Sequence, residues 1–337
     1  MRRWALAARL VVLAAALAAA LVGATRLGAA QLSAGAVVDA LFGRGDPTAV
    51  TIVRELRLPR ALQAALVGAS LALSGATFQS VFRNPLAEPY LLGVSSGASA
   101  GAVAAVVTGF AARAVWALPA ASFAGAAGAM LVVLRIAAGV GGPTGRALDT
   151  RVLLLAGVVV SSFLVAAVWL ALSFADVESV RSAIFWMMGS HAGATWRSVA
   201  TLGACLAPGA AALLALARPL NLLAVGEDTA AHLGTRVERT KLLAFAVATL
   251  LAAASVAVSG TIGFVGLVVP HAVRLAWGSD NRALMPAAAL AGAVFLVLAD
   301  AVARTAAGAT ELPVGVVTAF VGVPFFVWLL RRSGAGA

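Results

Sequence analysis

The sequence predicts an all-α integral membrane protein of one domain, with about ten transmembrane helices. Of its 337 residues, 62 % are hydrophobic and only 11 % are charged, whereas soluble domains are about 45–50 % apolar and about 25 % charged. The apolar residues also form long runs that recur along the whole chain. Only helices and closed barrels satisfy the backbone in lipid, and runs this long are typical of helices rather than of barrel strands.

Ten runs approach the length of about 20 residues that a membrane span needs. They cover residues 8–30, 60–82, 92–110, 115–138, 150–173, 197–217, 240–259, 263–277, 284–303 and 313–330. The run at 263–277 is short and contains Pro270, so we expect a broken or tilted helix there. The first run, with its basic start, also fits a signal peptide, although no clean cleavage site precedes Gln31.

The basic residues predict the orientation. The net charge is +11 and comes almost entirely from arginine, since Lys241 is the only lysine. Arginines scattered between apolar runs fit juxtamembrane positions better than a nucleic-acid partner. Several lie at the two ends of the chain: Arg2, Arg3, Arg9, Arg331 and Arg332. With ten spans both termini lie on one side, and the positive-inside rule predicts that this side is the cytoplasm.

An internal repeat is visible when residues 65–85 are laid on residues 250–270. Both segments contain AS, then SG, and then a proline eleven residues after that serine. Four predicted spans lie between them, so the two segments cross the membrane in opposite senses. The pattern therefore predicts an inverted-topology repeat, which is common in transporters.

The chain lacks the residues that would let it drive transport by itself. No GxxxxGK[ST] motif surrounds its single lysine, so any ATP is hydrolysed by another subunit. Asp300 is the only acidic residue well inside a run, and Arg304 lies four residues later, which predicts a local ion pair. This scarcity disfavours ion coupling. Three histidines in separate segments and the lone Cys205 predict no metal or cofactor site. Met187 and Met188 lie beside Trp186; they fit the entrance for an apolar ligand, or Trp186 anchors the chain at the membrane interface.

Two connections between spans carry unusual patterns. Residues 218–241 mix apolar with charged residues, which predicts a short amphipathic helix for a cytoplasmic partner. In NPLAEPYLLGVSSGASA (84–100), two prolines end the second span, and we expect Asn84 and Glu88 to meet water or polar partners there. Glycines then recur every fourth residue, at Gly93, Gly97 and Gly101, and predict close helix packing.

Four blocks of the sequence together resemble a known family, the permease subunits of ABC importers for iron chelates (siderophores), haem and vitamin B12. The blocks cover residues 57–99, 223–234, 259–282 and 298–330. The resemblance implies a type II ABC importer permease fold and a homodimer with twenty spans in the bacterial inner membrane. It also implies two ATP-binding subunits, which hold ATP and Mg, and a periplasmic substrate-binding protein.

The resemblance also assigns roles to particular residues. ATPase coupling by two short cytoplasmic helices falls on residues 222–234: Leu222, Leu223, Gly226, Glu227, Asp228, Thr229, Ala230, Leu233 and Gly234. The arginines that dock the binding protein fall on Arg57, Arg60 and Arg304. The cytoplasmic gate falls on Asn84 and Leu86, and on Thr150 with its neighbours Asp149 and Arg151.

The expected function is that of a permease without enzyme activity, which translocates a ferric siderophore or haem. Cobalamin is the alternative within the same family. An ion-coupled secondary transporter is the alternative from another class.

Overall fold

The computed structural model describes residues 3–28, 32–140, 148–308 and 310–334, and these residues form helices and connecting turns with no strand. Arg2, Gln31 and the last two residues of the predicted run 8–30 lie outside this part of the chain. Each of the ten predicted ranges contains a helix. They are α1 (Arg3–Arg26), α4 (Leu58–Val81), α5 (Val94–Val107), α6 (Ala117–Val140), α7 (Thr150–Ser173), α9 (Trp196–Ala215), α12 (Val237–Ser259), α13 (Val265–Trp277), α14 (Asn281–Thr305) and α15 (Val314–Gly334).

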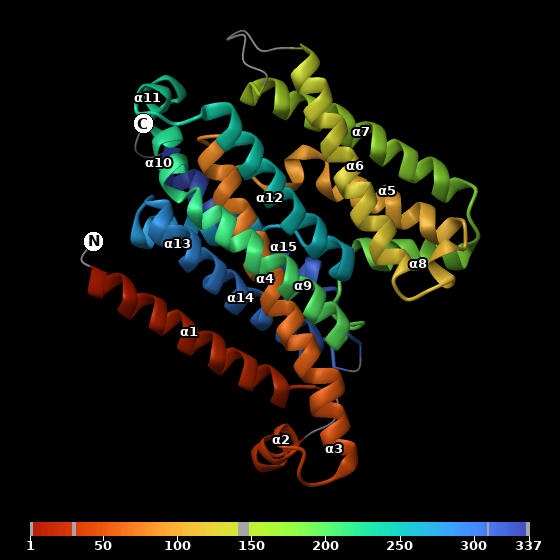
Figure 1. Cartoon of the computed structure of the whole chain (residues 1–337). Coiled ribbons are helices and arrows are strands. Elements are labelled where there is room, and N and C mark those ends of the chain that lie inside the picture. The colour runs from red at the N-terminus through yellow and green to blue at the C-terminus, as the bar shows by residue number, and fades with distance from the viewer. Residues whose placement is uncertain (1–2, 29–31, 141–147, 309, 335–337) are drawn as a thin grey trace.

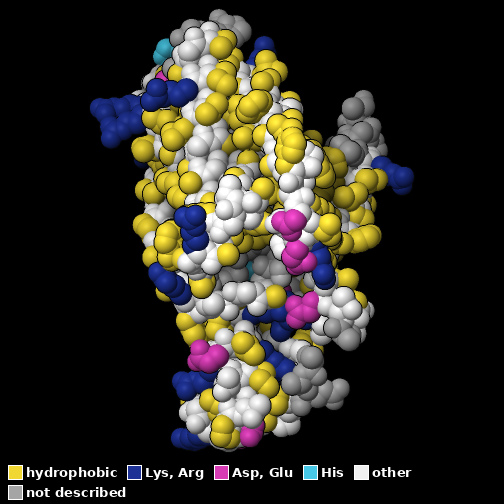
Figure 2. Space-filling view, turned by 90° about the vertical axis from the view of Figure 1, so that its right-hand side faces the viewer, with side chains coloured by type: hydrophobic (Ala, Val, Ile, Leu, Met, Phe, Trp, Pro, Cys, Tyr) yellow, Lys and Arg dark blue, Asp and Glu magenta, His cyan; other side chains and the backbone are white. Residues whose placement is uncertain are grey.

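Seven helices in the described part of the chain are long and apolar enough to cross a membrane. Three further apolar segments, at Val94–Val107, Val265–Trp277 and Val314–Trp328, are shorter. On the face shown in Figure 2, hydrophobic side chains cover much of the upper surface, and most of the acidic side chains lie in the lower half. Length, composition and surface therefore agree with a multi-pass membrane protein.

The connections contain shorter helices, of which the sequence predicts only those within residues 218–241. They are α2 (Ala34–Leu41), α3 (Pro47–Thr51), η1 (Ile52–Arg57), η2 (Pro89–Leu92), η3 (Phe110–Ala112), α8 (Val177–Met187), α10 (Ala217–Val225) and α11 (Glu227–His232). Local capping explains some of them: the Asp46 carboxylate accepts the Ala49 amide at 2.9 Å, and Pro47 opens α3.

The bundle has two ends, which can be followed in Figure 1. At the end that carries α2 and α3 (the α2 end), two arginines meet the last turn of α1. Arg57, directly before α4, donates to the Thr25 carbonyl at 3.0 Å, and Arg304 of α14 donates to the Ala24 carbonyl at 3.1 Å. At the opposite end (the α11 end), Ser80 near the end of α4 donates to Asn281 at the start of α14, at 2.9 Å. Helices α4 and α14 are therefore antiparallel.

Helix α4 runs through the centre of the bundle, and nearly all of its residues are buried. Glycines let its backbone touch its neighbours directly. A Cβ atom at Gly68 would overlap the Gly292 carbonyl of α14, and one at Gly75 would overlap the Gly266 carbonyl of α13. Gly75 belongs to the first copy of the internal repeat and Gly266 to the second, so the two copies interlock through backbone contacts.

The connections 82–93 and 260–264 both turn back into the bundle. The first leaves α4 at the α11 end and the second leaves α12 at the α2 end, yet the Tyr90 hydroxyl donates to the Ile262 carbonyl at 2.9 Å. They can meet only because α5 and α13 start inside the molecule. Their 14 and 13 residues extend about 20 Å, whereas the hydrocarbon core is about 30 Å thick.

This pair of connections, which we call re-entrant because both turn back into the bundle, refines two expectations. The run at 92–110 is α-helical only over Val94–Val107, because Gly93 in the left-handed conformation (φ 83°) separates α5 from η2. Glu88 meets a polar partner rather than open water, because its carboxylate accepts the Phe264 amide at 2.9 Å inside the bundle. Asn84 is exposed as expected, and its side chain accepts the Leu86 amide at 2.9 Å.

Candidate functional site

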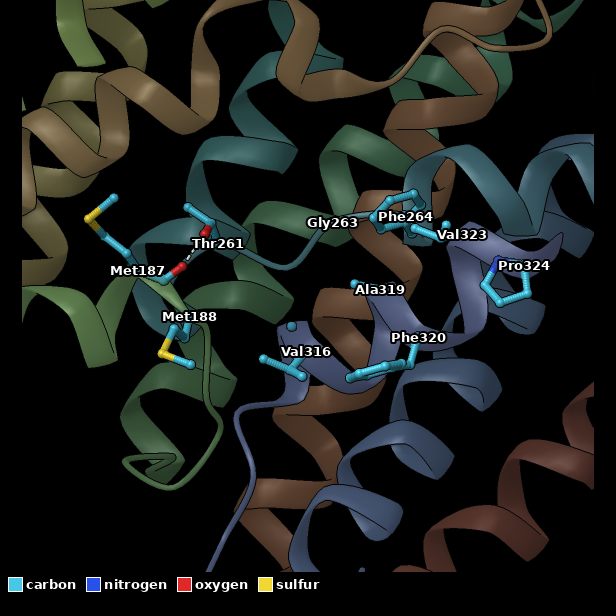
Figure 3. Close-up of a pocket in the computed structure, with 11 residues that line it drawn as sticks. Met187, Met188, Thr261, Gly263, Phe264, Val316, Ala319, Phe320, Val323 and Pro324 are labelled. Atoms are coloured by element: carbon cyan, nitrogen blue, oxygen red, sulfur yellow. Dashed lines mark hydrogen bonds between the residues drawn. The ribbon is translucent and has the colours of Figure 1, made fainter. Parts of the chain in front are cut away.

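A pocket of about 570 Å³ lies beside the re-entrant connection 260–264. Its walls come from the end of α8, this connection and one face of α15, and they include Met187, Met188, Thr261, Phe264, Val316 and Phe320. Figure 3 shows the two methionines and Thr261 on one side, with Val316, Ala319 and Phe320 of α15 nearby. A pocket of this lining offers apolar and polarizable contacts to a bulky ligand. Of the two readings for Met187 and Met188, the structure shows them lining a pocket.

Phe264 holds an unusual backbone conformation at this pocket. Its φ is 69°, in the left-handed region that non-glycine residues rarely occupy. The hydrogen bond from its amide to Glu88 fixes this turn at the start of α13, and its side chain packs against Gly322 of α15. The two re-entrant connections and α15 are thus joined at the pocket wall.

The single chain leaves apolar surface uncovered on α15, which lines the pocket, and on α7. On α15, Phe320 is 76 % exposed and Trp328 is 48 % exposed, and on α7 Phe163 is 72 % exposed. Lipid or a second copy of the chain fits such a surface.

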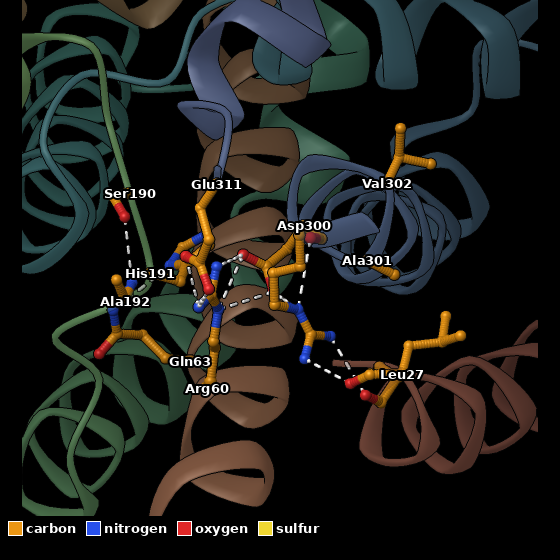
Figure 4. Close-up of polar contacts among 12 residues, drawn as sticks. Leu27, Arg60, Gln63, Ser190, His191, Ala192, Asp300, Ala301, Val302 and Glu311 are labelled. Atoms are coloured by element: carbon orange, nitrogen blue, oxygen red, sulfur yellow. Dashed lines mark hydrogen bonds and ion pairs between the residues drawn. The ribbon is translucent and has the colours of Figure 1, made fainter. Parts of the chain in front are cut away.

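The three arginines assigned to docking lie at the α2 end, but all three already have partners within the chain. Arg60 binds Asp300, with nitrogen–oxygen distances of 3.1 Å, and Glu311 at 2.9 Å. Arg304 pairs with the same Asp300 at 3.1 Å, as its spacing predicts. Figure 4 shows Asp300 between Arg60 and the guanidinium that reaches Leu27. Arg57 and Arg304 also bind carbonyl groups at the end of α1.

The partners separate these arginines more than burial does. Arg57 is 6 % exposed and Arg304 is 7 % exposed, and both serve the otherwise unpaired carbonyls that end α1. The Arg60 side chain is 11 % exposed, and its partner Glu311 is 49 % exposed, so Arg60 is the one of the three with a partner at the surface. The Arg60–Asp300 pair joins residues 240 positions apart, which is why sequence spacing reveals only the Arg304 partner.

The coupling segment at the α11 end consists of α10 and α11, separated by Gly226 with φ 153°. Leu223 and Ala230 are buried in the core, and Leu222 packs against it. Asp228, Thr229, Leu233 and Gly234 are exposed. Glu227 differs from its neighbours, because its carboxylate pairs with Lys241 at 2.8 Å and its side chain is only 15 % exposed.

The two predicted gate loops lie against different elements. Leu86 lines a small gap with Phe325 and Phe326 of α15. Thr150 begins α7, where the Asp149 side chain accepts the Arg151 amide at 2.8 Å. Leu148, just before this cap, is bound by Lys241, a residue whose role the sequence alone does not reveal.

The predicted glycine face on α5 is occupied by α6. A Cβ atom at Gly97 would lie 2.6 Å from the Ala129 Cβ, and one at Gly101 would overlap the Ala121 carbonyl. Gly93 lies outside this helix face, because it forms the left-handed turn before α5.

These features define a multi-pass membrane protein with an apolar pocket beside α15 and a compact pair of helices at one end. The chain belongs to the FecCD transport family, whose sequence profile matches residues 11–332. It is 48 % identical over 287 residues to the cobalamin import system permease protein BtuC of Halobacterium salinarum, covering 84 % of this chain and 74 % of that protein. It is 44 % identical over 289 residues to the vitamin B12 import system permease protein BtuC of Escherichia coli O157:H7, covering 86 % of each.

Solved structures agree with this assignment. An inward-facing structure of a putative metal-chelate type ABC transporter matches with a TM-score of 0.85 and 32 % identity, covering 96 % of this chain and 98 % of that one. PsaBC from Streptococcus pneumoniae shares the fold, with a TM-score of 0.57 and 16 % identity over 80 % of this chain and 89 % of that one. The chain is therefore an ABC importer permease. The curated relatives favour cobalamin, the alternative substrate, over the iron chelate or haem that was the main expectation.

Proposed function

We propose that this chain is the membrane permease of an ATP-driven importer for cobalamin. It works as a homodimer with two ATP-binding subunits and receives substrate from a periplasmic binding protein. The observation that supports cobalamin as the substrate is the 44–48 % identity to cobalamin permeases across most of the chain. The apolar pocket beside α15 supports it, because a bulky chelate is held there by surface contact rather than by a charged group.

The proposed orientation places the α11 end in the cytoplasm, together with both termini. The exposed arginines Arg218, Arg236 and Arg239 surround the coupling segment, in accord with the positive-inside rule. Val225 and Leu233 are 72 % and 62 % exposed there, and they offer an apolar surface to the ATP-binding subunits. The α2 end then faces the periplasm, where Arg60 would reach a carboxylate of the binding protein by exchanging its exposed partner Glu311.

Uptake by reconstituted vesicles tests the substrate. The chain, its ATP-binding subunits and its binding protein are supplied in turn with labelled cobalamin, a ferric siderophore and haem. We expect uptake of cobalamin that depends on ATP. Uptake of an iron chelate without cobalamin uptake would contradict the proposal and favour a ferric siderophore or haem as the substrate.

Gly226→Val tests the coupling segment. The φ of 153° disfavours a branched side chain, while a Cβ atom would meet nothing closer than the Thr229 hydroxyl at 3.7 Å. We therefore expect a folded, assembled complex in which α11 is tilted, and roughly fivefold less substrate carried per ATP hydrolysed.

The matched control is Gly193→Val, at an exposed glycine of the α2 end that has open space around it. It should keep normal uptake per ATP. Equal uptake per ATP in both variants would remove residues 222–234 from the coupling path.

A further inference from the structure

We propose that Lys241 is a positioning residue that ties the coupling helix α11 to the start of α7, so that these two elements move as one unit. Lys241 lies in the first turns of α12, and only 1 % of its side chain is exposed. Its ammonium group donates to the Glu227 carboxylate of α11 at 2.8 Å and to the Leu148 carbonyl. One side chain thus joins three elements at the α11 end.

The Leu148 peptide is held from both sides. Lys241 binds its carbonyl oxygen, and the Glu238 carboxylate, one turn earlier on α12, accepts its amide at 3.2 Å. The next residue, Asp149, caps α7 by accepting the Arg151 amide. A displacement of Leu148 therefore also moves the first turn of α7, because the hydrogen-bonded cap at Asp149 joins the two.

The energetics favour movement as a unit. The Lys241 charge is buried, and Glu227 is the carboxylate paired with it, so drawing α11 away would leave a buried cation without its counter-charge. Helix α11 has only six residues, too few to be stable without contacts to the rest of the chain. Its position depends on the Lys241 pair and on the buried Ala230. The long, flexible lysine stem suits a residue that must reach two acceptors on different elements.

The consequence concerns the path of coupling, and it rests on the proposed function. A force applied by an ATP-binding subunit to α11 reaches α7 as well as α12. Helix α7 begins at Thr150, the residue assigned to the second gate loop, and exposes Phe163 further along. The coupling segment and the gate loop, which sequence places apart, are thus connected by one buried lysine.

A distance measurement on the isolated chain tests the tie without any ATP-binding subunit. Spin labels are attached at Ala231→Cys on α11 and Arg151→Cys on α7, two exposed positions, after Cys205→Ala removes the single native cysteine. With Lys241 present we expect one narrow distance distribution. Lys241→Met should broaden or shift it, and Lys241→Arg should restore it. A narrow, unshifted distribution in a folded Lys241→Met protein would overturn the proposal.

Two further variants keep the test decisive. Arg239→Met removes an exposed cation from the same turns of α12 and should leave the distribution narrow; broadening there would also count against a specific role for Lys241. If Lys241→Met does not fold, Glu227→Ala removes only the α11 arm and should broaden the same distribution, and an unchanged distribution would overturn the proposal.

In the assembled complex, Lys241→Met should lower the substrate carried per ATP by roughly fivefold while hydrolysis continues, and Lys241→Arg should recover it. Unchanged uptake per ATP would reject Lys241 as part of the coupling path. A wild-type complex without any ATP-dependent uptake would instead reject the proposed function, and the spin-label distances would still decide whether the tie exists.

Discussion

Gly75→Ala is expected to destabilise the folded chain strongly. The added methyl group would overlap the carbonyl of Gly266, a backbone atom that cannot rotate away. Helices α4 and α13 would have to separate, and with them the two copies of the internal repeat. Overpacking typically costs about 1–3 kcal/mol, and we expect a loss of unfolding free energy at or above the upper figure. Denaturant unfolding in detergent, followed by circular dichroism, measures it.

Gly128→Ala is the matched control. Gly128 also lies inside a long helix, α6, but a Cβ atom there would meet nothing within 4 Å. Since alanine favours the helix over glycine by up to about 1 kcal/mol, this variant should be as stable as the parent or slightly more stable. Equal stability of both variants would contradict the backbone contact between the two repeats.

Asp300→Asn is expected to produce the second large loss of stability. Asp300 is 1 % exposed and is shared by two guanidinium groups, Arg60 and Arg304. Removing its charge leaves both arginines without this counter-charge inside the bundle, and the loss of one partner of a buried pair costs about 3–5 kcal/mol. Thermal unfolding should show a clear decrease. Glu311→Gln is the control: it removes the exposed partner of Arg60, and we expect a loss below about 1 kcal/mol.

The same variant separates the two classes of transporter. An ion-coupled carrier would need Asp300 as a proton or cation site, so Asp300→Asn would stop uptake without a matching loss of stability. Our account expects stability and uptake to decline together. A stable Asp300→Asn protein with no uptake would favour the ion-coupled alternative.

Features set by local pattern were accessible from sequence alone. The apolar runs locate ten helices because a segment that crosses the hydrocarbon core needs about 20 mostly apolar side chains, and four-residue spacing predicts the Asp300–Arg304 pair. The family resemblance indicated the importer class. The relatives then favoured cobalamin, the alternative substrate, over the iron chelate or haem that the sequence analysis put first.

Features that depend on contacts between distant segments were not accessible. The Tyr90–Ile262 and Glu88–Phe264 hydrogen bonds, which define the re-entrant pair, join residues more than 170 positions apart. The Lys241 contact with Leu148 spans 93 positions. No periodicity along the chain encodes such pairs. The burial of Arg57 was not predictable for the same reason. The family resemblance assigns it to docking, whereas its burial depends on its contact with the distant end of α1.

Uptake of labelled cobalamin by vesicles that contain the complete complex is the most direct test of the central claim, that this chain is the path of an ATP-driven importer. ATP is present or absent, and a protonophore collapses the ion gradients in a parallel sample. We expect uptake that requires ATP, the ATP-binding subunits and the binding protein, and that survives the protonophore. Uptake by this chain alone that the protonophore abolishes would contradict the account.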